Sequence, residues 1–276
     1  MKWGLVGLLV LAAGLTAAPA ALAKATQSTN WAGYAVHRDG ASFRRVSARW
    51  VQPNASCAGG QPSYSSAWVG LGGYSPTSDA LEQIGTELDC TASGKVVSSA
   101  WYELVPAPSK PISLAVQPGD VMHASVTVNG HQVVVELDNL TSHQSFRKIL
   151  HTAAIDVSSA EWIVEAPSEC ISQYSCQALP LANFGSITFD SASVVAADGK
   201  AGTIARGHWL RTKIRLTPGA QRLIVSRSST DTAGTAQPSA LRSGGSAFDV
   251  TFAAASAQSR PALAREARVR AAYLEH

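Results

Sequence analysis

The chain has 276 residues, of which 22 are Lys or Arg and 19 are Asp or Glu, so only 15% of it is charged. A typical soluble domain carries about 25% charged residues, and the low value here excludes a chain that is disordered by charge repulsion. The net charge of +3 comes from the two ends, because residues 24–259 carry no net charge. Such a body gives no support to a nucleic-acid partner, which requires a clustered basic face.

The first 23 residues predict a secretory signal peptide. Lys2 gives a positive start, residues 4–15 form an apolar run, and Ala21-Leu22-Ala23 offers the small residues after which signal peptidase cuts. Pro19 interrupts the apolar run, and no later segment reaches the roughly 18 to 20 apolar residues needed to span a bilayer. We therefore expect a secreted protein that starts near Lys24, without stable membrane insertion.

The cysteine count predicts disulfides. In an oxidising compartment the even number favours two bridges, and three pairings are possible among Cys57, Cys90, Cys170 and Cys176. Cys170 with Cys176 would close a short loop, and Cys57 with Cys90 a longer one. A zinc site is the alternative, but the sequence has neither Cys-x-x-Cys nor His-x-x-x-His spacing. We expect structural disulfides and no metal.

Short strands follow one another along the chain. They are rich in Val, Trp, Tyr, Phe and Thr, are bounded by turn residues, and cover Phe43–Gln52, Ser65–Gly70, Val97–Val105, Val121–Asp138 and Phe248–Ala253. Within the fourth segment, Asn129-Gly130 separates two alternating apolar runs and predicts a hairpin with a type I′ turn. No convincing amphipathic helix lies between the strands, so the pattern indicates an all-β antiparallel sandwich or barrel.

The domain is expected to cover residues 24–255, since no repeat or linker divides it. Residues 228–245 are full of Ser, Thr, Gly and Ala, which predicts a surface loop before the last strand. The tail, residues 256–276, is basic and predicts a helix that begins at Pro261. A solvated appendage is the preferred interpretation of this tail, and an anchor for an anionic surface is the alternative.

Several common catalytic motifs are absent from the sequence. It has no Gly-x-Ser-x-Gly, no His-Glu-x-x-His, no phosphate-binding Gly-x-x-x-x-Gly-Lys and no nucleotide fingerprint. The seven histidines are scattered, and none sits in a motif that pairs it with a nucleophile. These absences disfavour serine hydrolases, zinc peptidases and NTPases.

What remains is a set of polar residues inside strand-like segments: Leu81–Gly85, Trp101–Leu104 and Glu161–Pro167. In the third segment, period two places Glu161 and Glu165 on the face opposite Trp162. Taken by itself, that pattern is typical of solvated carboxylates, and a lone Gln in a strand is typically structural.

An ordered set of motifs gives these residues a sharper meaning. The set resembles the glutamic endopeptidases, or eqolisins, over about residues 30–254, and consists of Asn30-Trp31-Ala32-Gly33, Trp50 with Pro53, Trp68-Val69-Gly70-Leu71-Gly72-Gly73, Glu82-Gln83-Ile84-Gly85, Trp101-Tyr102-Glu103-Leu104-Val105-Pro106, Val116-Gln117-Pro118-Gly119-Asp120 and Glu161-Trp162-Ile163-Val164-Glu165. The resemblance implies a concanavalin-A-like (jelly-roll) sandwich of two curved antiparallel sheets. It also implies a catalytic pair at Gln83 and Glu165.

The chemistry of such a pair suits amide hydrolysis. Attack on an amide needs a base for the water, a donor for the oxyanion and a proton for the leaving amine. A Glu165 carboxylate can take the water proton and return it to the amine, while the Gln83 amide orients the water and donates to the oxyanion. An unperturbed Glu has a pKa of about 4.3, so a base of this kind predicts activity in acid without a cofactor.

The resemblance also extends to residues around the pair. It implies that Trp31, Trp68 and Trp101 line the cleft and that Glu103 and Glu87 are polar positions near the site, all five being candidates for substrate binding; plain sheet packing is the alternative for each. Two departures stand out, because fungal members carry Asp where Gly72 stands and Trp where Leu104 stands. The first bears on the hydrogen-bond network and pH optimum, and the second on subsite preference.

We therefore expect a secreted, monomeric acid endopeptidase that acts on polypeptides. The enzymatic alternative is a glycoside hydrolase or lyase on the same sandwich, with Glu103 and Glu165 as its two acids. The non-catalytic alternative is a carbohydrate-binding module whose tryptophans hold sugar.

Overall fold

The computed structural model describes residues 24–75, 77–172, 175–217 and 234–254. The predicted leader, the tail and its helix lie outside these residues, as does the first part of the predicted loop, residues 228–233. Within the described ranges, no helix combines the length and apolar character needed to cross a membrane.

The described chain is built almost wholly of strands, joined by short loops and one 3-10 helix. In chain order the elements are β1 (Lys24–Ser28), β2 (Trp31–His37), β3 (Phe43–Val51), β4 (Ser63–Gly72), β5 (Leu81–Cys90), β6 (Val96–Val105), β7 (Lys110–Ile112), β8 (Val121–Asn129), β9 (Gln132–Asn139), β10 (Gln144–His151), β11 (Ser159–Glu165), β12 (Ser168–Ser172), β13 (Ser175–Ala178), β14 (Ser186–Ala196), β15 (Ala201–Gly202), β16 (Leu210–Leu216), β17 (Thr235–Pro238), η1 (Ser243–Gly245) and β18 (Phe248–Ala253).

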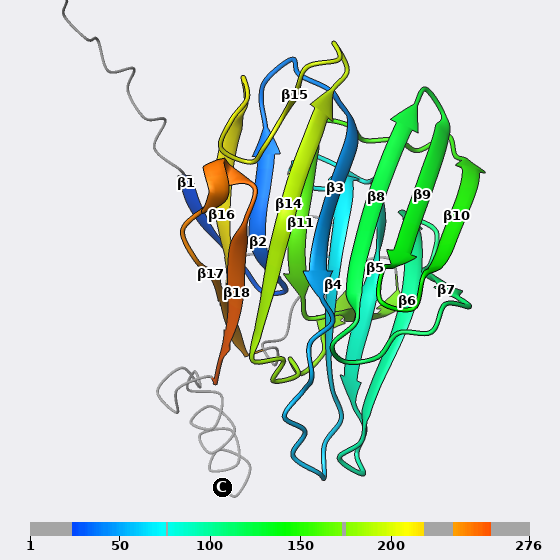
Figure 1. Cartoon of the computed structure of the whole chain (residues 1–276), viewed down its shortest axis with the longest axis vertical. Helices are drawn as coiled ribbons and strands as arrows, with labels where there is room; N and C mark the ends of the chain where they lie inside the picture. The colour runs from blue at the N-terminus through cyan, green and yellow to red at the C-terminus, as the bar shows by residue number, and fades with distance from the viewer. Residues whose placement is uncertain (1–23, 76, 173–174, 218–233, 255–276) are drawn as a thin grey trace, which may run out of the picture.

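These strands form two curved layers that face each other (Figure 1). The front layer runs in the order β10-β9-β8-β3-β14-β18, and the site layer in the order β16-β2-β11-β4-β5-β6-β7. The predicted sandwich of curved antiparallel sheets is confirmed, with one refinement. Because β17 pairs with both β18 and β16, the layers belong to one continuous sheet of 16 strands that curves nearly into a barrel.

The core between the layers is held by apolar packing and by two buried indoles. Trp162 of β11 is fully buried, and its Nε1 donates to the Ser47 carbonyl of β3 at 2.9 Å. In the other direction, Trp50 Nε1 of β3 donates to Thr86 Oγ1 of β5 at 3.0 Å. Each indole fills the space between layers and satisfies its polar atom across it, which fixes how the layers sit on each other.

The predicted strands agree with β3, β4, β6, β8, β9 and β18, and the predicted hairpin is present. The predicted type I′ turn is wrong: Asn129 pairs with Gln132, so Gly130 and His131 form the turn, and of these only Gly130 has positive φ (59°), as in a type II′ turn. The prediction of a loop over residues 228–245 is wrong for Thr235–Pro238, which form β17. These four residues lack a strong strand pattern. They are extended because β16 and β18 leave an edge that they fill.

One of the predicted disulfides is present between described residues. Cys57, in the loop after β3, bonds to Cys90 at the end of β5, with the two Cα atoms 5.4 Å apart. This bridge ties the loop between β3 and β4 to the site layer. In the hairpin β12–β13, the backbone register places Cys170 opposite Cys176, but their side chains lie outside the described part, so that bridge stays a prediction.

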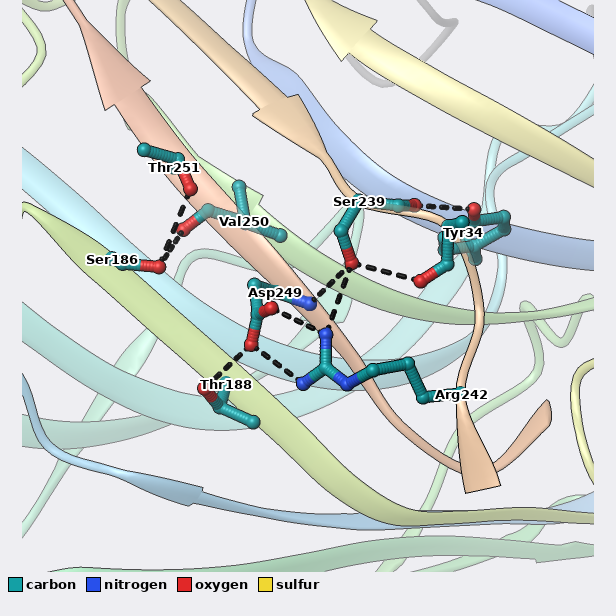
Figure 2. A network of polar contacts seen from close by, with 9 residues as sticks. Tyr34, Ser186, Thr188, Ser239, Arg242, Asp249, Val250 and Thr251 are labelled. Atoms are coloured by element: carbon teal, nitrogen blue, oxygen red, sulfur yellow. Dashed lines mark hydrogen bonds and ion pairs between the residues drawn. The ribbon is translucent and has the colours of Figure 1, made fainter. Parts of the chain in front are cut away.

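A polar network closes the seam where the front layer turns into the site layer (Figure 2). The Arg242 guanidinium binds the Asp249 carboxylate of β18 with two nitrogens, and Thr188 Oγ1 of β14 donates to the same carboxylate at 2.7 Å. The Tyr34 hydroxyl donates a hydrogen bond to the backbone carbonyl of Ser239, which follows β17, at 2.7 Å. Tyr34 lies on β2, so the network joins β2, β14 and β18.

We expect Asp249→Asn to lower the melting temperature at pH 6 by roughly 2 °C, the size typical of a solvent-accessible ion pair. The hydrogen bonds and charge of Arg242 lower the pKa of Asp249. A lowered pKa in the folded state stabilises the fold above the unfolded pKa, and this stabilisation is lost as pH falls through the folded pKa. The difference between wild type and variant should therefore shrink below pH 3 in thermal melts. A difference that stayed constant from pH 6 to pH 2.5 would contradict this assignment.

Candidate active site

The face of the site layer that points away from the core carries a second apolar cluster. It consists of Trp31, Ala35, Trp68, Leu81, Trp101, Ile163 and Ile214, with Tyr74 and Val105 packed against it. The three tryptophans predicted to line a cleft are thus brought together on one face, which we call the site face. Trp31 and Trp68 meet edge to face, with ring centroids 5.0 Å apart and planes at 77°.

Glu165, the last residue of β11, lies at the edge of this cluster. Its neighbours Trp162 and Val164 face the core, so the strand alternation turns Glu165 to the site face, as the sequence pattern predicts. Its Oε2 accepts the indole N–H of Trp68 at 2.8 Å, and its Oε1 accepts the amide of Asn30 at 2.8 Å. The carboxyl group is held in place yet remains partly accessible to solvent.

Opposing effects act on the pKa of Glu165. Burial is the largest, and together with the nearby Glu103 carboxyl it raises the pKa to about 7. The hydrogen bonds from Trp68 and Asn30 oppose this rise, as does the nearby Trp31 indole, because these N–H groups favour the charged form. Glu165 is therefore a carboxyl group that exchanges its proton near neutrality, unlike the unperturbed Glu assumed from sequence.

Gln83 lies on β5 and is buried, with only 4% of its surface exposed. Its Nε2 donates to Glu103 Oε2 of β6, directly opposite in the register, at 2.6 Å. Its Oε1 is buried and has no hydrogen-bond partner among the described residues. One amide hydrogen and the carbonyl oxygen of Gln83 therefore remain available on the site face.

No hydrogen bond joins Gln83 to Glu165 among the described residues. On β4, the strand between β5 and β11, Gln83 lies opposite Gly70 and Glu165 lies opposite Ser66. Trp68 falls between these two positions, next to Gly85, which has no side chain to displace it. Trp68 therefore lies, along β4, between the register positions of the two polar groups and donates its indole N–H to Glu165.

Glu87 and Asp89 continue the line of polar side chains along β5. Ser99 Oγ donates to Glu87 Oε2 at 3.2 Å, and burial raises the Glu87 pKa. Burial and the charge of Glu87 raise the pKa of Asp89 to about 7. Glu103, by the same desolvation, also has a pKa of about 7. The structure thus brings the predicted acids Glu87 and Glu103 to the site face, and adds Asp89.

Asp156, from another loop, occupies the space beside Gly72, where fungal members of the family carry Asp. Gly72 has φ 86°, and a Cβ built there would lie 2.7 Å from Cβ of Asp156 and 2.5 Å from its carbonyl oxygen. Asp156, in the loop before β11, accepts Gly73 N at 3.1 Å and the hydroxyl of Ser78. Hydrogen bonds from Ser78, Ser158 and Gly73 outweigh burial and lower its pKa. A carboxylate is therefore present beside residue 72, although the sequence there has only Gly.

Leu104, which stands where fungal members carry Trp, does not enlarge the site. Its side chain is partly buried and packs against the core between the layers, on the face opposite Glu103. A smaller residue than Trp there changes the packing of the core and leaves the site face as it is.

Besides Asp89, Asn30 and Asp156 were not assigned to the site from sequence. Asn30 was quoted only as part of a motif, although its amide contacts Glu165, and Asp156 has no motif at all. Glu161, which the strand alternation places on the same face as Glu165, is fully buried, and neither of its carboxyl oxygens has a hydrogen-bond partner among the described residues. Burial raises its pKa well above the ordinary value, and likewise raises that of Glu82 to about 8.

Other features of the described residues lie away from this site. A hollow of about 390 Å³ lies near the disulfide and includes no residue of the site face; it is lined by Ser56, residues 58–63, Pro180, Leu181, Asn183 and Phe252. Among the described residues, no three His, Cys, Asp or Glu side chains are grouped so that they could hold a metal ion.

The chain is similar to known glutamic peptidases in sequence and fold. The Peptidase A4 family model matches residues 29–235. A crystal structure of scytalido-glutamic peptidase with a transition-state analogue is 26% identical, covering 82% of this chain and 98% of that one, with a TM-score of 0.63. SCP-B, an eqolisin solved with the tripeptide Ala-Ile-His, is 24% identical over the same shares, with a TM-score of 0.62. Aspergilloglutamic peptidase from Aspergillus niger is 23% identical, covering 69% and 99%, with a TM-score of 0.52. No curated protein matches the sequence.

We expect the protein to lose stability as pH rises from 5 to 8. Glu82 and Glu161 have raised pKa values in the folded state, so their stabilising effect is complete below the unfolded pKa and is lost as pH rises through the folded values. Glu161→Gln, which cannot ionise, should flatten the fall in melting temperature over this range by several degrees. Thermal melts of both proteins from pH 4 to pH 8 measure it; parallel curves would show that Glu161 has the same pKa in the folded and the unfolded protein.

Gly72→Asp should be harmful in this protein, although it restores the residue of the fungal relatives. The new side chain would meet Asp156 at less than van der Waals distance and in a backbone conformation that few residues other than Gly adopt. We expect a melting temperature lowered by several degrees and reduced peptidase activity. The double variant Gly72→Asp with Asp156→Gly leaves one carboxylate in that space and should recover part of both losses. A Gly72→Asp protein as stable as wild type would contradict the crowding.

Proposed function

The chain belongs to the Peptidase A4 family, and we propose on this basis that it is a secreted endopeptidase whose catalytic residues are Glu165 and Gln83. The observation that carries the proposal is the contrast between these two polar groups on one face. Glu165 is held by two N–H donors, while Gln83 keeps an unpaired Oε1 and one free amide hydrogen. The leader predicted at residues 1–23 and the disulfide Cys57–Cys90 support secretion.

The proposed reaction uses one water molecule and no cofactor. The Glu165 carboxylate takes a proton from water as the water oxygen bonds to the peptide carbonyl carbon, and the carbonyl electron pair moves onto its oxygen. The free N–H of Gln83 donates to this oxyanion, and Oε1 of Gln83 accepts a hydrogen of the attacking water. The C–N bond then breaks, and Glu165 returns its proton to the leaving amine nitrogen.

Glu103 and Glu165 must hold different protonation states for this reaction. Each has a pKa of about 7, and the charge of Glu103 raises that of Glu165, so the two titrate as a coupled pair. The active form has Glu165 charged and Glu103 neutral, because a charged Glu103 beside Gln83 would repel the oxyanion. This argues for activity in the weakly acid range, at higher pH than an unperturbed Glu would give.

The remaining residues of the site face have binding roles in this proposal. Trp101, with 8% of its surface exposed, offers an apolar contact to a polypeptide substrate, while Trp31 and Trp68, exposed by 1% and 0%, support it from beneath. Glu103 and Glu87 offer polar contacts at the side of the substrate. The proposal takes the working unit as a monomer. Family membership favours this peptidase over the glycoside hydrolase or lyase and the carbohydrate-binding module considered from sequence.

The pH profile of cleavage of denatured casein tests these roles. For wild type we expect kcat/KM to rise with pH as Glu165 ionises and to fall again as Glu103 ionises. Glu165→Gln and Gln83→Ala should each lower kcat/KM by about 100-fold or more, the scale of losing a general base or an oxyanion donor. Cleavage should resist pepstatin.

Glu103→Gln separates the peptidase from the glycosidase alternative. It should abolish the high-pH fall and move the low-pH limb downward, because the competing carboxyl group is gone. In a glycosidase, the same variant would remove one of two essential acids and silence the enzyme. A wild-type profile that stays flat down to pH 3 would show that Glu165 works in its protonated form, and casein cleavage that survives Glu165→Gln would overturn the dyad.

A further inference from the structure

The bend between β1 and β2 lies beside the end of β11. There the side chain of Asn30 donates to Glu165 Oε1 at 2.8 Å, and the carbonyl of Asn30 accepts Ala166 N at 2.8 Å. Asn30 therefore holds both the carboxyl group of Glu165 and the backbone that follows it. Only 2% of Asn30 is exposed, so water does not compete for the contact.

Ser28 fixes the orientation of the Asn30 amide. The Ser28 hydroxyl donates to Asn30 Oδ1 at 3.0 Å and accepts Trp31 N at 3.1 Å. Because the oxygen of the amide is taken by this donor, its NH2 group must point to Glu165. Ser28 is fully buried, so the link between Ser28, Asn30 and Glu165 is shielded from solvent along its length.

Strand β1 in turn seats Ser28. It pairs in parallel with β16, from Lys24 opposite Thr212 to Ser28 opposite Leu216, and Thr217 N donates to the Ser28 carbonyl at 2.8 Å. This is the parallel edge of an otherwise antiparallel sheet, and it continues directly into the bend that reaches the site. The first strand of the domain is thus connected to Glu165 through two side chains.

We propose that Ser28 and Asn30 are positioning residues that place the negative charge of the site on Glu165 instead of Glu103. The inference rests on the proposed function of Glu165. Glu165 accepts two side-chain N–H groups, from Trp68 and Asn30. Glu103 accepts the amide of Gln83 and the backbone N–H of Ser109. Loss of Asn30 would remove a donor from Glu165 and none from Glu103, so the preference for a charged Glu165 would weaken.

Other groups near Glu165 leave this preference unchanged. The residues aligned with Glu165 across the sheet are Trp31 on β2, Ser66 on β4 and, one strand further, Glu87 on β5. Of these only Glu87 titrates. Glu87 is the same residue in wild type and in variants of the bend, so a change seen on altering the bend reports the loss of the donor.

The test compares pH profiles of kcat/KM for Asn30→Ala, Ser28→Ala and a matched control. Loss of a hydrogen bond to a charged group should move the low-pH limb upward by about one pH unit, with about tenfold lower kcat/KM on the acid side and a smaller loss at the optimum. The control is Thr29→Val. Thr29 lies in the same bend, is buried, and its hydroxyl has no partner among the described residues, so its limb should stay in place.

The outcomes separate the two proposals. If Glu165→Gln retains activity, the proposed function fails. If Glu165→Gln is inactive but neither Asn30→Ala nor Ser28→Ala moves the limb, or Thr29→Val moves it equally, the positioning role is wrong and the bend is only structural. Ser28→Ala removes a single oxygen atom, so it decides the question should Asn30→Ala fail to fold.

Discussion

A carboxyl group that is taken out of water without a cationic partner is the constraint on which the site depends. Glu165 loses hydration at the site face, and no Lys or Arg among its described contacts compensates for this loss. Its charge is instead stabilised by neutral N–H donors, one from the bend before β2 and one from β4. Because these donors come from segments far apart in sequence, the whole order of strands β1, β2, β11 and β4 is needed to bring them together. The pairing and register of these strands, more than any single loop, thus bring the donors to Glu165.

The same absence of cations explains the behaviour of the neighbouring acids. Glu103, Glu87 and Asp89 all lie on one face and all have raised pKa values from burial. Each is more easily neutral than an exposed acid, so they can crowd around a site where an oxyanion forms without repelling it. A lysine in this region would form ion pairs with the acids and lower their pKa values. Glu103 would then be charged together with Glu165, which is unfavourable for a site where an oxyanion forms.

The sequence was sufficient for the strands whose alternation is strong, such as β3, β8, β9 and β11, and for the faces that Trp162 and Glu165 occupy. It was insufficient where a neighbour decides the structure. β17 is extended because the edges of β16 and β18 need a partner. Glu161 is buried near Glu82 of β5 and Asp156 of a loop, neighbours that its own strand pattern does not reveal. Asp156 could not be found from sequence, since it approaches Gly72 from a loop 84 residues further along the chain.

Low charge content also takes on a different meaning in the folded protein. Salt bridges are few among the described residues, and those present lie on the surface, as in Arg242 with Asp249 or Arg147 with Glu136. Protonating their acids therefore removes little stability as pH falls. The buried acids act in the opposite direction, because each is neutral in acid and must lose its proton against the cost of desolvation as pH rises. The protein therefore loses little stability in acid from its few paired carboxylates, and its buried carboxyl groups are neutral there. Both effects favour the folded state at low pH. This is the condition in which Glu103 is neutral, so the range of greatest stability overlaps the acid side of the range in which the site works.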